Sequence, residues 1–188
     1  MWLDRVQDQS DEDIEINWKN FSLQQINASD PGDWRVWHES DLTKTRSLMA
    51  SLAGEAAKKQ GTDKFSKFFL ELLTQRHGGN RVPLNDNSVF LEVAENCGLD
   101  LKKFAEDLKD ESLLDTIAND HTEATEVYGA FGTPTFVFES GQTAYLKTFI
   151  PPVEESKQAF DNFIEMFSNR SYIGEVKRPQ PPWPKGAV

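Results

Sequence analysis

Cysteine is nearly absent from this sequence of 188 residues, since Cys97 is the only one. A single cysteine excludes a disulfide framework within the chain, a Cys-x-x-Cys redox pair and a cysteine-rich zinc site. It also favours a reducing compartment, so we predict a cytoplasmic protein of bacterial type. Because Cys97 ends an expected helix and precedes Gly98, we interpret it as a small buried hydrophobic residue.

Long apolar runs are missing as well, and no stretch approaches the roughly 18–20 residues of a membrane helix. The start of the chain lacks a basic segment followed by an apolar one, so no signal peptide is predicted. Positive charge is scarce: 20 Lys and Arg against 31 Asp and Glu give a net charge of -11. The basic residues form no cluster, which argues against nucleic acid or an anionic membrane as a partner. We interpret the acidity as a contribution to solubility.

Apolar residues are plentiful enough for a packed core, at 38% of the chain with 13 Phe and 5 Trp. The length is that of one ordinary domain. In the middle of the chain, apolar residues recur with helical period in five segments: 41–59, 62–77, from Asp86 or Asn87 to Gly98, 101–108 and 112–128. Gly61 is expected to end the first segment, and Thr62 to cap the second.

Strand patterns lie on both flanks of this helical block. After a short helix at residues 2–7, Ile14–Trp18 alternates apolar and polar residues, as a half-buried strand does. Residues 135–138 and 143–149 predict a hairpin, and residues 153–167 a final helix. The proline-rich tail from about residue 176 is expected to be extended. The fold class is therefore α/β, with a sheet-containing domain at residues 1–39 and 129–188 and an all-helical insertion at residues 40–128.

The most informative short motif is Gly132-Thr133-Pro134, directly before the first strand of the hairpin. Proline cannot donate to a sheet ladder, so its place at a strand start needs a reason. One alternative is an ordinary trans proline at a sheet edge. The other is a cis Thr133–Pro134 bond, which turns the chain tightly and presents the Thr133 backbone N–H and C=O outward; position in the sequence alone favours trans.

Other candidate sites are weaker. The three histidines, His38, His77 and His121, lack the spacing of a metal site, so neither a metal nor another cofactor is predicted. His77 is interpreted as a cation at a helix C-terminus and His121 as a partly exposed helix residue. The role of three aromatic residues stays open between two alternatives. They line an apolar groove beside the Thr133–Pro134 turn, or they pack the helical insertion onto the sheet; the residues are Phe21, Trp34 and Trp37.

Several segments carry a family resemblance. Residues 129–138 resemble the cis-proline loop and following strand of the DsbA-like branch of the thioredoxin superfamily. Four more pieces agree with that group in order and spacing: Trp2-Leu3 with Ile14–Leu23, Arg76-His77, Cys97–Asp100 and Tyr172–Pro179. The resemblance implies a thioredoxin-like fold interrupted by a helical domain. It also implies a thiol-disulfide oxidoreductase acting on a low-molecular-weight thiol or a protein, with Thr133 pairing with the substrate backbone and Pro134 shaping the turn.

The chain departs from this family at its start. The resemblance implies a first strand and a Cys-x-x-Cys, or a Ser variant, before the segment that opens at Met1, so we expect no dithiol chemistry from these residues. Three explanations stay open: a start codon assigned too late, which we favour, a truncated relative, or a partner segment that fills the gap between Ile14–Trp18 and Phe136–Phe138. Two functional alternatives also remain. One is a non-catalytic module that binds a thiol, peptide or small ligand, and the other is a glutathione-dependent isomerase or transferase of the hydroxychromene-carboxylate isomerase type.

Overall fold

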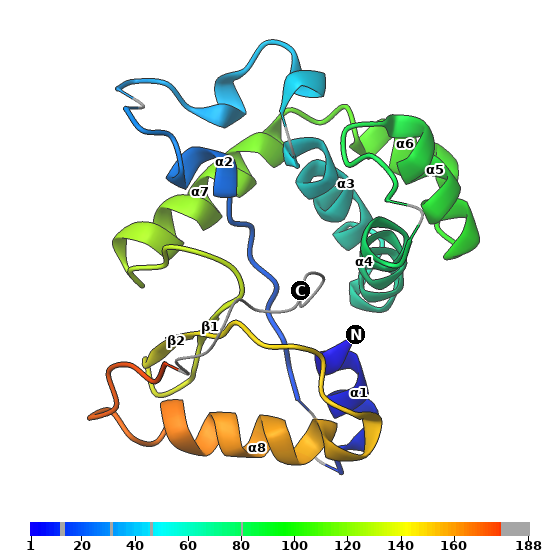
Figure 1. Ribbon diagram of the computed structural model, residues 1–188. Helices are drawn as coiled ribbons and strands as arrows, with labels where there is room; N and C mark the ends of the chain where they lie inside the picture. Colours follow the sequence, from blue (N-terminus) through cyan, green and yellow to red (C-terminus); the bar gives the residue numbers. More distant parts are fainter. Residues whose placement is uncertain (12–13, 31, 46, 80, 178–188) are drawn as a thin grey trace. The chain divides into compact units, whose positions relative to one another are not determined.

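The computed structural model describes residues 1–11, 14–30, 32–45, 47–79 and 81–177. The chain folds into two compact units (Figure 1). The first, called the hairpin unit below, combines Met1–Trp18 with Tyr128–Val188, and the second, the helical unit, is Lys19–Val127. The predicted extended tail after residue 177 lies outside the described residues. Among those that are described, no helix is long and apolar enough to cross a membrane.

The helical unit contains most of the core, because its helices bury apolar residues three, four and seven positions apart. In α4, for example, Phe65, Phe68 and Leu72 are buried, and the Phe68 ring lies 5.4 Å from that of Phe104. The elements of this unit are α2 (Leu23–Ile26), η1 (Val36–His38), η2 (Leu42–Lys44), α3 (Leu48–Lys58), α4 (Thr62–His77), α5 (Asn87–Asn96), α6 (Leu101–Asp107) and α7 (Ser112–Glu126).

The helix ends of this unit differ in part from prediction. Asp86 caps α5 as expected, accepting a hydrogen bond from the Ser88 N–H. The expected cap at Thr62 is wrong, since Gly61 occupies that position and Thr62 begins the helix. The predicted helix 41–59 begins at Leu48, because Asp41 caps a separate short 3-10 turn at Leu42–Lys44.

The hairpin unit is built on one antiparallel strand pair, β1 (Thr135–Val137) with β2 (Thr143–Tyr145), in the register Thr135↔Tyr145. Gly141 has φ of 79°, the left-handed conformation that closes a three-residue hairpin loop. Helix α8 (Ser156–Phe167) lies beside the strand pair (Figure 1). Its Phe163 ring covers one face of the pair, 4.8 Å from Phe136 and 5.6 Å from Phe138.

The same helix also contacts the beginning of the chain. Helix α1 (Trp2–Gln9) packs along α8 and the 3-10 turn η3 (Val153–Glu155), where the Trp2 indole N–H donates to the Ser156 C=O at 2.9 Å. The strand predicted at Ile14–Trp18 is wrong: these residues form no ladder with the described part of the chain. Their side chains nevertheless alternate between half-buried and exposed, because the segment is extended.

The aromatic core of the helical unit gives a stability prediction. Replacing the fully buried Phe68 by Ala leaves a cavity between α4 and α6 and is expected to lower the free energy of unfolding by about 3–5 kcal/mol. Phe69→Ala, on the neighbouring position of the same helix, removes a half-buried ring and is expected to cost less. Urea denaturation followed by circular dichroism measures both variants. Equal losses would contradict the placement of the core.

Candidate functional site

The turn before β1 is the centre of the candidate site. The Thr133–Pro134 peptide is cis, and both residues are exposed. Two hydrogen bonds hold the turn: the Thr135 hydroxyl donates to the Gly132 C=O at 2.8 Å, and the Leu146 N–H donates to the Pro134 C=O at 3.2 Å. The turn is therefore anchored on both strands of the hairpin, and Thr133 is presented to solvent at its tip.

One backbone edge of β1 faces away from β2. In an antiparallel pair, alternate residues direct their N–H and C=O groups toward the partner strand. Pro134 and Phe138 hydrogen-bond to β2 and its flanks at Leu146 and Gln142, and this alternation also directs Phe136 to Ala144. The groups of Thr135 and Val137 therefore point to the other side, where the described sheet has no third strand. This edge can accept an added strand.

An exposed apolar surface lies on the face of the hairpin opposite Phe163. It consists of Phe131, Val137 and Tyr145, which are 67%, 46% and 40% exposed, and it is called the hairpin patch below. The Phe131 and Tyr145 rings contact each other with centroids 4.9 Å apart. Gly132 lies close against the Tyr145 ring, and a Cβ at that position would lie 3.1 Å from it, so a larger residue would shift the ring.

The hairpin unit as a whole exposes more large apolar side chains than it buries. Of the thirteen large hydrophobic residues that are exposed among those described, ten belong to this unit. Only four of the twenty-one buried hydrophobic residues belong to it: Val6, Ala130, Ala144 and Phe163. A balance of this kind is typical of a surface that binds another protein.

The other predicted site residues belong to the helical unit. Phe21 and Trp37 both contact one side chain, the His121 imidazole, at centroid distances of 4.9 and 5.4 Å. The Trp34 indole N–H donates to the Glu39 carboxylate. The structure thus brings Phe21 and Trp37 together around His121, while Thr133 and Pro134 are part of the hairpin unit. Their role in binding stays a prediction.

A buried polar cluster around Asp120 and His121 was missed from the sequence. The prediction that His121 is partly exposed is wrong, since it is 5% exposed and its Nδ1 accepts a hydrogen bond from the Ser22 N–H at 3.2 Å. Burial lowers the pKa of His121. Asp120 accepts from Lys19 Nζ and from the backbone and side chain of Asn20. No local pattern signals contacts across 99 to 101 residues.

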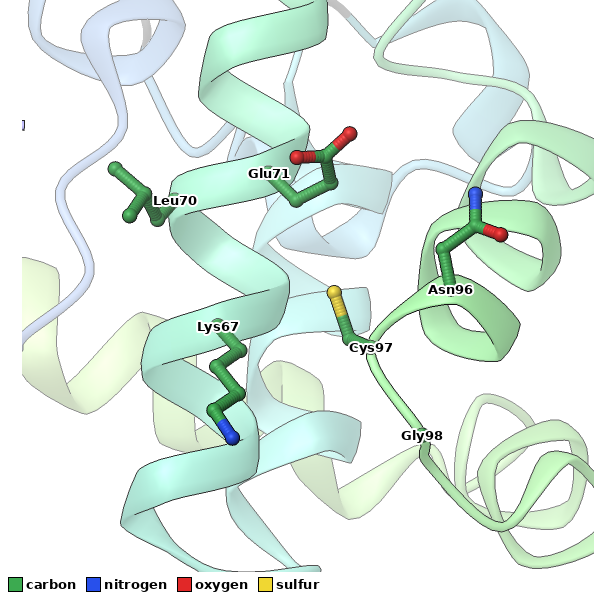
Figure 2. Close-up of a pocket in the computed structure, with 6 residues that line it drawn as sticks. All are labelled: Lys67, Leu70, Glu71, Asn96, Cys97 and Gly98. Atoms are coloured by element: carbon green, nitrogen blue, oxygen red, sulfur yellow. The ribbon is translucent and has the colours of Figure 1, made fainter.

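Cys97 lies in a surface pocket of the helical unit with a volume of about 490 Å³. Figure 2 shows the cysteine in the turn after α5, beside Lys67, Leu70 and Glu71 of α4. The thiol is half-buried rather than fully buried. Burial raises its pKa, the nearby Glu71 carboxylate raises it further, and Lys67 opposes both. These surroundings favour the protonated thiol, which is a poor nucleophile. Among the described residues, no group of histidine, cysteine and carboxylate side chains is arranged to hold a metal ion.

The charges around Cys97 predict its reactivity. In the folded chain at pH 8, Cys97 is expected to react with an aromatic disulfide reagent more slowly than in the urea-unfolded chain, because less thiolate is present and access is reduced. Glu71→Gln should speed the reaction and Lys67→Ala should slow it, and both are followed by the absorbance of the released thiolate. The same rate in both variants would contradict this electrostatic account.

Comparison with known proteins identifies the family. A ClpXP adapter protein, SpxH of Bacillus subtilis, is 34% identical to this chain over 110 residues. The matched region covers 58% of this chain and 36% of that protein, so it corresponds to little more than a third of that protein's length. A family model described as thioredoxin matches residues 2–147, a range that includes the whole helical unit, the Thr133–Pro134 turn and both hairpin strands but not α8. The chain therefore belongs to this thioredoxin family.

Proposed function

We propose that this chain is a non-catalytic member of the thioredoxin family that binds other proteins through the hairpin patch. The observation that carries the proposal is the exposure of Phe131, Val137 and Tyr145 beside an open strand edge. Aromatic side chains of this kind dominate the energy of protein interfaces, because each buries a large area with few rotatable bonds.

The geometry suits a partner segment in extended conformation. Backbone groups of Thr135 and Val137 offer hydrogen bonds along the β1 edge, and the hairpin patch offers contacts for apolar side chains. Addition of a strand to an exposed edge obtains affinity from the main chain and selectivity from alternate side chains. Thr133 and Pro134 keep the role that the DsbA-like resemblance implies, which is to pair with the bound segment and to shape the turn.

The relative suggests where such binding is used. SpxH is an adapter of ClpXP by name, and an adapter has to bind proteins rather than transform them. We therefore propose an adapter role for this chain, in the bacterial cytoplasm, where a ClpXP-type protease is the first partner to test. A single cysteine with a raised pKa agrees with a role that needs no thiol chemistry.

Binding to purified ClpX tests this role. The double variant Phe131→Ala, Tyr145→Ala is expected to weaken the complex by roughly 30-fold or more, because even one hot-spot aromatic contributes about 2 kcal/mol or more. Tyr172→Ala is the matched control, since this tyrosine of the same unit is 78% exposed and lies outside the hairpin patch. Dissociation constants are measured by interferometry, after circular dichroism shows that each variant is folded. No binding of the native chain, or equal weakening by Tyr172→Ala, would contradict the proposal.

A second candidate is the thiol-disulfide oxidoreductase that the family resemblance implies, and the cis Thr133–Pro134 turn favours it. Reduction of a disulfide by a dithiol requires a second cysteine to release the mixed disulfide. The 188-residue chain has Cys97 alone, so it is expected to reduce insulin with dithiothreitol no faster than dithiothreitol does by itself. Turnover that is lost in Cys97→Ser would support the oxidoreductase instead.

A further inference from the structure

The polar cluster of the helical unit occupies a particular place in the chain. The chain crosses from the hairpin unit to the helical unit between Trp18 and Lys19, and it returns between Val127 and Tyr128. The first crossing opens directly into the segment Lys19–Ser22. The second follows α7, which ends at Glu126 and carries Asp120 and His121 in its last two turns. The cluster therefore joins the segment where the chain enters the helical unit to the last two turns of the helix that precedes its exit.

Five polar contacts hold Lys19–Ser22 to α7. Lys19 Nζ lies 2.9 Å from Asp120 and 3.4 Å from Glu123. The Asn20 N–H and its side-chain amide both donate to Asp120 at 3.0 Å, and the Ser22 N–H donates to His121 Nδ1 at 3.2 Å. Asp120 and His121 are both buried, whereas Lys19 and Glu123 are about half exposed, so the bonds of Asn20 and Ser22 are better shielded from water than the ion pairs.

The bond to His121 depends on the protonation of the imidazole. Nδ1 accepts from Ser22 only when that nitrogen carries no proton, which places the proton of the neutral ring on Nε2. A second proton on the ring turns Nδ1 into a donor that faces the Ser22 N–H, which is also a donor, so the hydrogen bond is lost. The hydrogen bonds of Asp120 do not depend on the protonation of His121. The Asp120 carboxylate, paired with Lys19, accepts them whether the imidazole is neutral or charged.

The charged groups around His121 come from every neighbouring element. Asp120 and Glu123 share its helix, Lys19 precedes the segment that contacts it, and His38 follows Trp37 in η1. Glu55 and Lys58 of α3 reach the cluster through Asn20, whose amide donates to Glu55 at 2.7 Å. The ring itself is flanked by Phe21 and Trp37.

We propose that Asp120 and His121 form a clamp that holds the segment Lys19–Ser22 to α7, and that protonation of His121 opens the clamp at that end while the Asp120 end stays closed. Burial holds the pKa of His121 below its ordinary 6.5. The hydrogen bond is therefore fully present above pH 6.5 and is lost as the pH falls through the lowered value. The result is a pH-sensitive attachment of the first residues of the helical unit to α7.

Amide exchange in the full chain, measured by NMR, tests the clamp. Between pH 7.5 and 5.0 the protection factor of the Ser22 amide is expected to fall by about tenfold, the equivalent of one hydrogen bond. The Asn20 amide, bonded to Asp120, is the internal control and should keep its protection. At pH 7.5 the His121 ring should be neutral with its proton on Nε2, as nitrogen chemical shifts report.

Two variants distinguish the protonation of His121 from other effects of low pH on the chain. His121→Asn places an amide oxygen where Nδ1 stands and does not titrate, so Ser22 protection should no longer depend on pH. His38→Asn removes an exposed histidine and should leave the pH dependence as it is. A pH-independent Ser22 amide in the native chain would overturn the proposal, and so would a pH dependence that persists in His121→Asn. Should His121→Asn fail to fold, a ring that is charged at pH 7.5 or has its proton on Nδ1 would overturn it equally.

Discussion

The uneven distribution of buried apolar surface is the constraint on which the rest of the structure depends. Folding of a domain is driven mainly by the burial of such surface, and in this chain the helical unit contains seventeen of the twenty-one buried hydrophobic residues described. The hairpin unit has one large buried anchor, Phe163, packed on Phe136 and Phe138. Its opposite face and its β1 edge have no cover among the described residues, so contact with another protein is the natural way to complete them.

This constraint also bears on the proposed role. The chain belongs to the thioredoxin family, and its Thr133–Pro134 turn is exposed. The role that the family resemblance implies for Thr133, pairing with the backbone of a bound segment, would serve a redox enzyme and a binding protein alike. A dithiol mechanism additionally needs two cysteines, whereas the only cysteine of these 188 residues is in the helical unit, with a raised pKa. These observations support the proposal of binding over dithiol chemistry by these residues.

Sequence patterns predicted local structure well where the signal was local. The helical periods found all five helical segments, and the Gly132-Thr133-Pro134 motif located the hairpin and its turn. The prediction failed at Ile14–Trp18, because alternation specifies an extended segment but a strand also requires a neighbour. It failed again at His121, whose helix position looked partly exposed. The residues that bury it, Phe21 and Trp37, lie 84 or more positions earlier in the chain, and no local period records them.

The Asp120–His121 cluster shows why such distant contacts matter. A buried carboxylate is tolerated only when its hydrogen bonds are satisfied, and Asp120 is satisfied by Lys19 and Asn20, the first two residues of the helical unit. The neighbouring residue, His121, accepts a hydrogen bond from Ser22 only while its imidazole is neutral, whereas Asp120 accepts its bonds as a charged carboxylate. Two adjacent residues thus hold one segment by contacts that respond differently to protons. That difference allows the segment to loosen at its His121 end while its Asp120 end stays attached to α7.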